Sequence, residues 1–325
     1  MNSFNLKTKW GLLLAVVVGL LVISVISVGQ QRGPKIIIEP TRLESAKGTL
    51  VFELQDGSVS EDAVLSIFKV LFGFRADLAQ DEEGFSYSGG KEDPNFFFFV
   101  DRKTTELSFT RSELLQGKKR LPGAQESFKE VLAFLEETGL VQLDEKELVV
   151  AHFGALTECT LDDSGIETRQ DRLATLHIAR RLEGRSVYGP GSKIIAHLNE
   201  FGIVGLTKRW ATISDARAAE EFGVESPKQI PGLIETHLRN EWVSASKIEV
   251  TDIKLVYYDG MGNFIQPVYA FVARVMFTDE SKILPFDYLG FVPALVDPPE
   301  PIFRVEIGDR GMPPREAKPT QGEQD

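Results

Sequence analysis

The chain contains few side chains in patterns that could carry out chemistry. Its four histidines are far apart in the sequence, and none lies in an HExxH pattern or beside a cysteine: His152, His177, His197 and His237. Such patterns are the usual local signals of a zinc site. The run GPGSK at Gly189–Lys193 lacks the glycine spacing of a phosphate-binding loop, and the Gly-x-Ser-x-Gly elbow of hydrolases is absent. The sequence therefore predicts no catalytic residue, no metal site, no cofactor and no enzymatic activity.

The single cysteine, Cys159, excludes an intramolecular disulfide. No histidine lies within six residues of it, so we expect a small buried or half-buried side chain rather than a nucleophile. Stability must then come from burial, and a folded region of about 270 residues is large enough for one or two cores.

The charge of the chain argues against a nucleic-acid partner. It has 36 basic and 48 acidic residues and a formal net charge of -12. Binding to phosphates needs a concentrated cationic surface, whereas the basic groups here are short and scattered, as at Lys118–Arg120 and Lys208–Arg209.

An uninterrupted apolar run occupies Gly11–Val28, after Lys7 and Lys9. A membrane-spanning helix needs ~20 largely apolar residues, so the run predicts a single-pass anchor in the cell membrane. The short leader, residues 1–10, would be cytoplasmic, and the large C-terminal region extracytoplasmic. The alternative is a cleaved signal peptide, whose apolar region is usually shorter, ~7 to 15 residues.

Composition divides the rest of the chain. Residues 29–34 are predicted to be a linker, and residues 35–160 and 161–307 to be two lobes. Residues 308–325 contain almost no large apolar side chain, so they are predicted to be a disordered tail.

The first lobe shows two helix signals. Ser60 can cap a helix over residues 61–72 that Gly73 ends, and a second helix follows Gly123 and stops at Gly139. Between them, Phe96–Val100 (FFFFV) and residues 107–110 are predicted strands, the first buried on both faces or covered by a helix.

The second lobe is richer in strands. Strands are expected over residues 173–182, 193–199, 203–213, 250–258, 268–277 and 282–292, with 268–277 central because both of its faces are apolar. Helices are expected over residues 214–222 and 227–238, with Ser226 capping the second. This order predicts an α+β fold, in which helices pack on one face of antiparallel sheets.

Residues 173–295 resemble PepSY-like extracytoplasmic proteins, which include membrane-anchored regulators of the Gram-positive cell-wall sensor kinase and propeptides of secreted metalloproteases. The matching residues are Gly184, Val187, Gly189-Pro190-Gly191, Gly202, Val204-Gly205-Leu206, Trp210, Tyr257-Tyr258 and Pro267-Val268-Tyr269. The resemblance implies PepSY-like or cystatin-like lobes after the anchor, and an activity of binding or inhibition without catalytic residues.

We therefore expect a non-enzymatic binding or regulatory module for a protein partner in a bacterial cell envelope, attached to the membrane through Gly11–Val28. The alternatives are a structural subunit of a membrane complex and an envelope hydrolase with a dispersed active site. Partner contact is predicted at Tyr257, Tyr258 and Tyr269, at least one of which should face outward, because an aromatic ring with a polar tip suits an interface. The competing interpretation places all three in the core.

Overall fold

The computed structural model describes residues 33–39, 42–55, 59–73, 78–88, 96–111, 120–139, 145–162, 165–278 and 282–302. The predicted leader, the apolar run Gly11–Val28 and the predicted tail lie outside these ranges. Within them, no helix combines the length and the apolar character needed to cross a bilayer.

The predicted fold class is wrong. The described residues are mostly β, and they form a large mixed sheet instead of an α+β arrangement of antiparallel sheets led by a transmembrane helix. Two causes stand out. Residues 148–161 and 167–182 form two long strands, whereas only one short strand, residues 173–182, was predicted there. The predicted helix over residues 214–222 begins as a strand.

The strands that the structure describes form one hydrogen-bonded network with two halves. Sheet 1 is antiparallel and has the order β7-β8-β10-β11-β6-β5-β4-β3. Its strands are β3 (Ala79–Gln80), β4 (Gly84–Ser88), β5 (Phe96–Asp101), β6 (Leu107–Arg111), β7 (Leu148–Leu161), β8 (Glu167–Leu182), β10 (Lys193–Asn199) and β11 (Gly202–Arg209).

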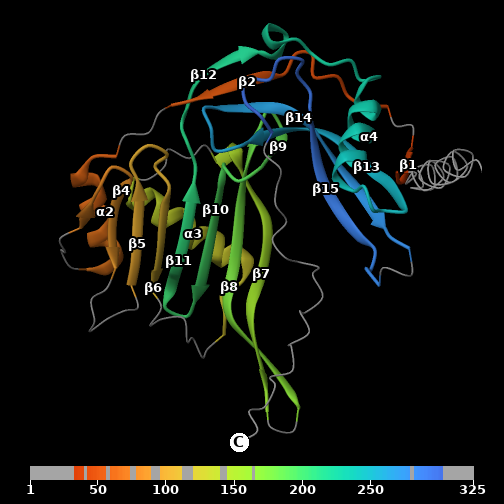
Figure 1. Cartoon of the computed structure of the whole chain (residues 1–325). Coiled ribbons are helices and arrows are strands. Elements are labelled where there is room, and N and C mark those ends of the chain that lie inside the picture. Colours follow the sequence, from red (N-terminus) through yellow and green to blue (C-terminus); the bar gives the residue numbers. More distant parts are fainter. Residues whose placement is uncertain are drawn as a thin grey trace, which may run out of the picture.

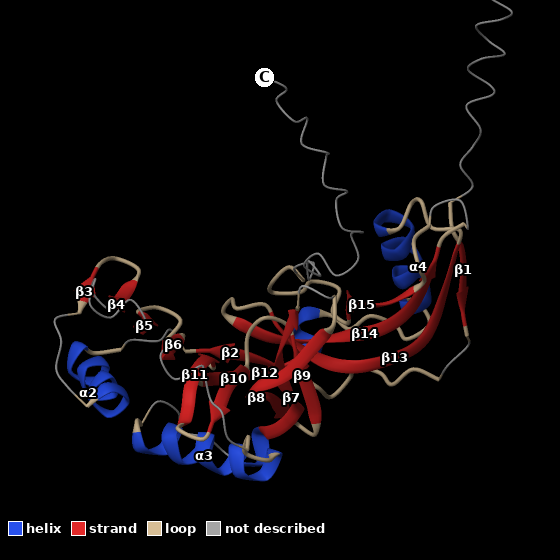
Figure 2. Cartoon of the chain, turned by 90° about the horizontal axis from the view of Figure 1, so that it is seen from below, coloured by secondary structure: helices blue, strands red, loops and turns tan. Residues whose placement is uncertain are grey.

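Helices α2 (Glu61–Phe72) and α3 (Ala124–Glu137) lie on the same side of sheet 1 in both overall views (Figure 1, Figure 2). The larger core lies between these helices and the sheet, and it includes Phe68, Phe98, Val131, Leu176 and Ile194. Among the described helices, none lies over the opposite face of sheet 1.

Sheet 2 contains strands from both ends of the described chain. They are β1 (Lys35–Ile38), β2 (Leu50–Leu54), β9 (Arg185–Tyr188), β12 (Ile213–Ala218), β13 (Lys247–Asp259), β14 (Phe264–Met276) and β15 (Phe286–Pro293). β1 and β9 run parallel to β13, which makes the network mixed. Helix α4 (Ile230–Glu241) packs on this sheet around a second core. Short 3₁₀ turns lie at Glu145–Glu147 and Ala219–Phe222.

Strand β9 joins the two halves, since it pairs with β8 on one side and with β13 on the other. The predicted division between residues 160 and 161 falls inside β7, which pairs with β8 along its whole length. β1 and β2, from the predicted first lobe, lie in sheet 2.

Several local predictions are confirmed. The Oγ of Ser60 accepts a hydrogen bond from the Ala63 N–H (3.3 Å), and Gly73 ends α2 in the left-handed conformation, with φ 73°. β14 is central, because β13 pairs with one edge and β15 and β2 with the other. In the FFFFV run, Phe98 and Val100 are buried under α2 while Phe97 is exposed, so a helix covers one face only.

Two helix predictions need correction. Residues 214–218 belong to β12, which pairs with β2 from Ile213↔Leu54 to Ala218↔Leu50, so pairing with a distant strand overrides the local helical pattern. α4 begins at Ile230 rather than at residue 227, and its N-cap is Gln229, not Ser226.

Candidate functional site

The helix-free face of sheet 1 is the first candidate surface. On β8, Leu176 and Ile178 point into the core beneath the helices. Because side chains alternate along a strand, His177 lies on the opposite face, and on β10 the same alternation places Lys193 and His197 there. All three side chains are half-buried.

Three histidines meet on this face, although they are far apart in the sequence. His152 of β7 is the cross-strand partner of His177, and their ring centroids are 5.4 Å apart. His197 is the partner of Thr175, two residues from His177 on β8, and its Nδ1 lies 3.1 Å from the Thr175 Oγ1. We call the surface formed by these five residues the histidine face: His152, Thr175, His177, Lys193 and His197.

Gly154 leaves room for the imidazole of His152, whereas a side chain at Gly205 would make only an ordinary van der Waals contact with His197. A Cβ at Gly154 would lie 2.8 Å from the Nε2 of His152, which is closer than real Cβ atoms approach. Gly205, the partner of His197 on β11, would place a Cβ 3.5 Å from the His197 Cδ2. At position 154 a larger residue would displace the ring.

Two residues of the histidine face, His177 and His197, resist protonation. Burial lowers the pKa of His177, and His152, His197 and Lys193 lower it further because each would add a like charge. Burial alone lowers the pKa of His197. Burial, followed by Arg209, lowers the pKa of Lys193, while Asp259 and Glu106 act in the opposite direction. Over the described ranges, no group of three His, Cys, Asp or Glu side chains is placed to hold a metal ion.

These shifts predict that acid destabilises the fold. The unfolded chain binds protons at the ordinary histidine pKa of about 6.5, before folded His177 and His197 do, so the free energy of unfolding should fall between about pH 7 and pH 5. The double variant His177→Asn/His197→Asn should show a smaller fall in urea denaturation at the two pH values. Equal falls in the two proteins would contradict the assignment.

The second candidate surface is a hairpin that projects from sheet 1. Beyond residue 155 the strands β7 and β8 leave the body of the molecule (Figure 1), and residues 155–162 and 165–171 are exposed. We call residues 156–172 the arm. Polar cross-strand contacts hold its strands together: Thr157 Oγ1 donates to Asp171 Oδ1 (2.6 Å), and Arg172 Nε donates to Glu158 Oε2 (2.6 Å).

Two exposed apolar side chains flank the polar turn at the end of the arm. Leu161 is 73 % exposed and Ile166 is 63 % exposed, on either side of the turn closed by the hydrogen bond from the Asp162 N–H to the Ile166 carbonyl (3.1 Å). Cys159 also lies on the arm and is exposed, so the prediction that it is buried or half-buried is wrong. The arm is not predicted from the sequence, where its one local signal is the turn-forming run DDSG at residues 162–165.

The three predicted contact tyrosines are buried: Tyr257 is 0 %, Tyr258 1 % and Tyr269 1 % exposed. The prediction that at least one faces outward is therefore wrong. The physical reason is that both faces of β13 and β14 are covered at this point, so that rings on either side enter a core.

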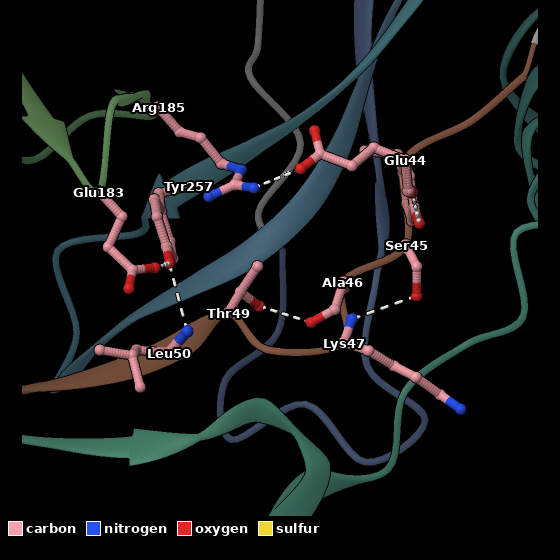
Figure 3. Close-up of polar contacts among 10 residues, drawn as sticks. Glu44, Ser45, Ala46, Lys47, Thr49, Leu50, Glu183, Arg185 and Tyr257 are labelled. Atoms are coloured by element: carbon pink, nitrogen blue, oxygen red, sulfur yellow. Dashed lines mark hydrogen bonds and ion pairs between the residues drawn. The ribbon is translucent and has the colours of Figure 1, made fainter.

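The hydroxyl groups of Tyr257 and Tyr269 make hydrogen bonds that stabilise the fold. Tyr257 Oη donates to the Glu183 carboxylate and accepts from the Leu50 N–H at 3.3 Å, and Arg185 of the same turn pairs with Glu44 (Figure 3). Tyr269 Oη donates to the Glu44 carbonyl (2.7 Å). Together these bonds fasten the segment between β1 and β2 to the turn between β8 and β9.

The GPGSK run is a turn, as predicted, and lies where the two halves meet. The buried Asp259 carboxylate accepts from the Ser192 Oγ (2.6 Å) and from the Met261 N–H (2.9 Å). A Cβ at Gly191 would lie 2.2 Å from that carboxylate. A cavity of about 200 Å³ adjoins these groups, but they bond to one another, which indicates a structural junction.

The fourth histidine, His237, lies apart from the others, on α4. Its Nε2 is 2.8 Å from the Tyr288 Oη, and it lines an apolar groove of about 370 Å³ between α4 and β15.

Comparisons with known proteins add little. No protein-family model and no curated protein matches the chain. A solved structure of an uncharacterized protein from Eubacterium rectale ATCC 33656 is similar, with 11% identity over 85% of this chain and 92% of that chain. The TM-score is 0.43, which is too low to carry an argument about fold or function.

Proposed function

We propose that this chain is a non-enzymatic binding protein that contacts a protein partner through the arm. The observation that carries the proposal is the exposure of two apolar side chains, Leu161 and Ile166, beside the turn at the end of the arm. Two-stranded hairpins without a covering layer are only marginally stable in water. A projecting hairpin with exposed apolar side chains is therefore suited to contact with another protein.

The backbone of the arm supports the same function. Among the described strands, β7 pairs with β8 alone, so its other edge presents free N–H and C=O groups along the arm. Such an edge can accept a strand from a partner. The resemblance of residues 173–295 to PepSY-like proteins, which act by binding, agrees with this role, and it suggests a partner in the cell envelope.

The position of Cys159 allows a direct test. Because it is the only cysteine in the sequence and is exposed on the arm, a maleimide photocrosslinker labels the arm alone. We expect irradiation in cell extract to attach one specific protein. The control variant Cys159→Ser/Ser244→Cys carries the label on an exposed turn of the other half, and it should not capture that protein.

Charged residues in place of Leu161 and Ile166 should weaken binding. We expect Leu161→Asp/Ile166→Asp to weaken the affinity for the captured partner at least tenfold, as for loss of central interface contacts. The matched control is Leu284→Asp, since Leu284 is even more exposed but lies far along the chain, before β15. Equal binding by both variants, or turnover of a substrate by the purified chain, would overturn the proposal.

A further inference from the structure

The histidine face offers a surface whose charge depends on pH. From β7 it receives His152, from β8 His177 and from β10 His197 and Lys193. The same face of β8 continues to the exposed Arg181. The helices face the opposite side of the sheet, so they contribute no charge here.

Three carboxylates around this face, those of Glu106, Asp259 and Asp171, already have partners. On β11, Arg209 is paired with Glu106, with 2.8 Å between Nε and Oε1. Asp259, which acts on Lys193, accepts from Ser192. Farther along β8, Asp171 of the arm accepts from Thr157. No carboxylate contributes to the pKa of His177 or His197. His177 and His197 therefore lack an anionic partner within the described residues.

We propose that the histidine face binds a carboxylate-rich segment of a partner protein, and that this binding strengthens as His177 and His197 take up protons. Imidazolium N–H groups donate strong hydrogen bonds to carboxylates. An acidic ligand also offsets the electrostatic repulsion among the three rings and Lys193, because it supplies the negative charge that the isolated face lacks.

Charge complementarity identifies this occupant. The chain as a whole carries -12, so at neutral pH it repels an acidic segment at long range. As the pH falls, protonation of His177 and His197 adds positive charge beside Lys193 on one face while most carboxylates stay ionised. The local attraction then opposes the general repulsion. The proposal does not depend on the arm, because it involves different residues and a different ligand class.

The test uses the full chain and a fluorescent poly-glutamate peptide, with a poly-glutamine peptide as the neutral probe. We expect the affinity for poly-glutamate to be at least tenfold higher at about pH 5.5 than at pH 7.5, because histidine titrates in this range. The triple variant His152→Asn/His177→Asn/His197→Asn should lose this difference, whereas His237→Asn, on α4, should retain it.

The protonation itself can be measured. Calorimetry of poly-glutamate binding in two buffers with different ionisation enthalpies should show net proton uptake by the wild type and none by the triple variant, whose folding is checked by circular dichroism. Equal binding at both pH values, or an unchanged pH dependence in the folded triple variant, would overturn the proposal. Tighter binding of inorganic polyphosphate than of poly-glutamate would also overturn it, because it would show a general anion site.

Discussion

Replacement of Tyr257 by alanine should lower the free energy of unfolding by about 3 to 5 kcal/mol, the range for a buried aromatic residue. The ring is fully buried and packs edge to face on Phe52, with centroids 5.3 Å apart. Its hydroxyl joins the Leu50 N–H and the Glu183 carboxylate. Alanine therefore leaves both a cavity and two polar groups without their partner. Urea denaturation of the purified chain measures the effect.

Tyr257→Phe is the matched control, because it keeps the ring and removes only the hydroxyl. We expect a smaller loss, of about 0.5 to 1.5 kcal/mol, the usual net contribution of one hydrogen bond, because Glu183 is exposed to water and Leu50 is only half-buried. A loss below about 1 kcal/mol for Tyr257→Ala would contradict the burial of this ring and would reopen its role as a contact residue.

Replacement of Lys208 by methionine should stabilise the protein at neutral pH by about 2 to 3 kcal/mol. Lys208 of β11 is only 2 % exposed, and its ammonium group donates to the Thr105 carbonyl at 3.3 Å. Burial lowers its pKa from 10.5 to about 8. Each unit of pKa corresponds to about 1.36 kcal/mol, and methionine fills a similar volume without the charge.

The pH dependence gives this prediction a second measurement. Between about pH 8 and 10.5 the unfolded lysine holds a proton that the folded lysine has lost, so wild-type stability should rise relative to Lys208→Met across this window. The advantage of the variant should therefore shrink as the pH increases. A variant that is less stable than the wild type at pH 7 would show that the bond to Thr105 outweighs the cost of burial.

The sequence predicts the parts of this fold that depend on local chemistry. The bounds of α2 follow from Ser60 and Gly73, because capping and left-handed conformation are properties of single residues. Apolar residues on both faces of residues 268–277 identify β14 as a central strand for a similarly local reason. Local chemistry does not predict the strand at residues 214–218, since their pairing with β2 depends on residues far away in the chain.

The candidate site depends on register, which spacing does not reveal. His152 and His177 become neighbours because the β7–β8 pair has one alignment out of several, with a bulge between Val150 and His152. The prediction that a tyrosine faces outward was wrong for the opposite reason. Their type suits an interface as well as a core, and only the covering layers decide between the two.

Strand β8 runs without a break from the arm to the turn at Glu183. Its 16 residues, at about 3.3 Å each, make a rod roughly 50 Å long. One end meets the proposed partner, and the other end adjoins Glu183 and Arg185, which hold Tyr257 and Glu44. A force applied to the arm is therefore transmitted along the backbone of β8 to the contacts that hold β2. The hairpin can thus act mechanically on the fold as well as provide a binding surface.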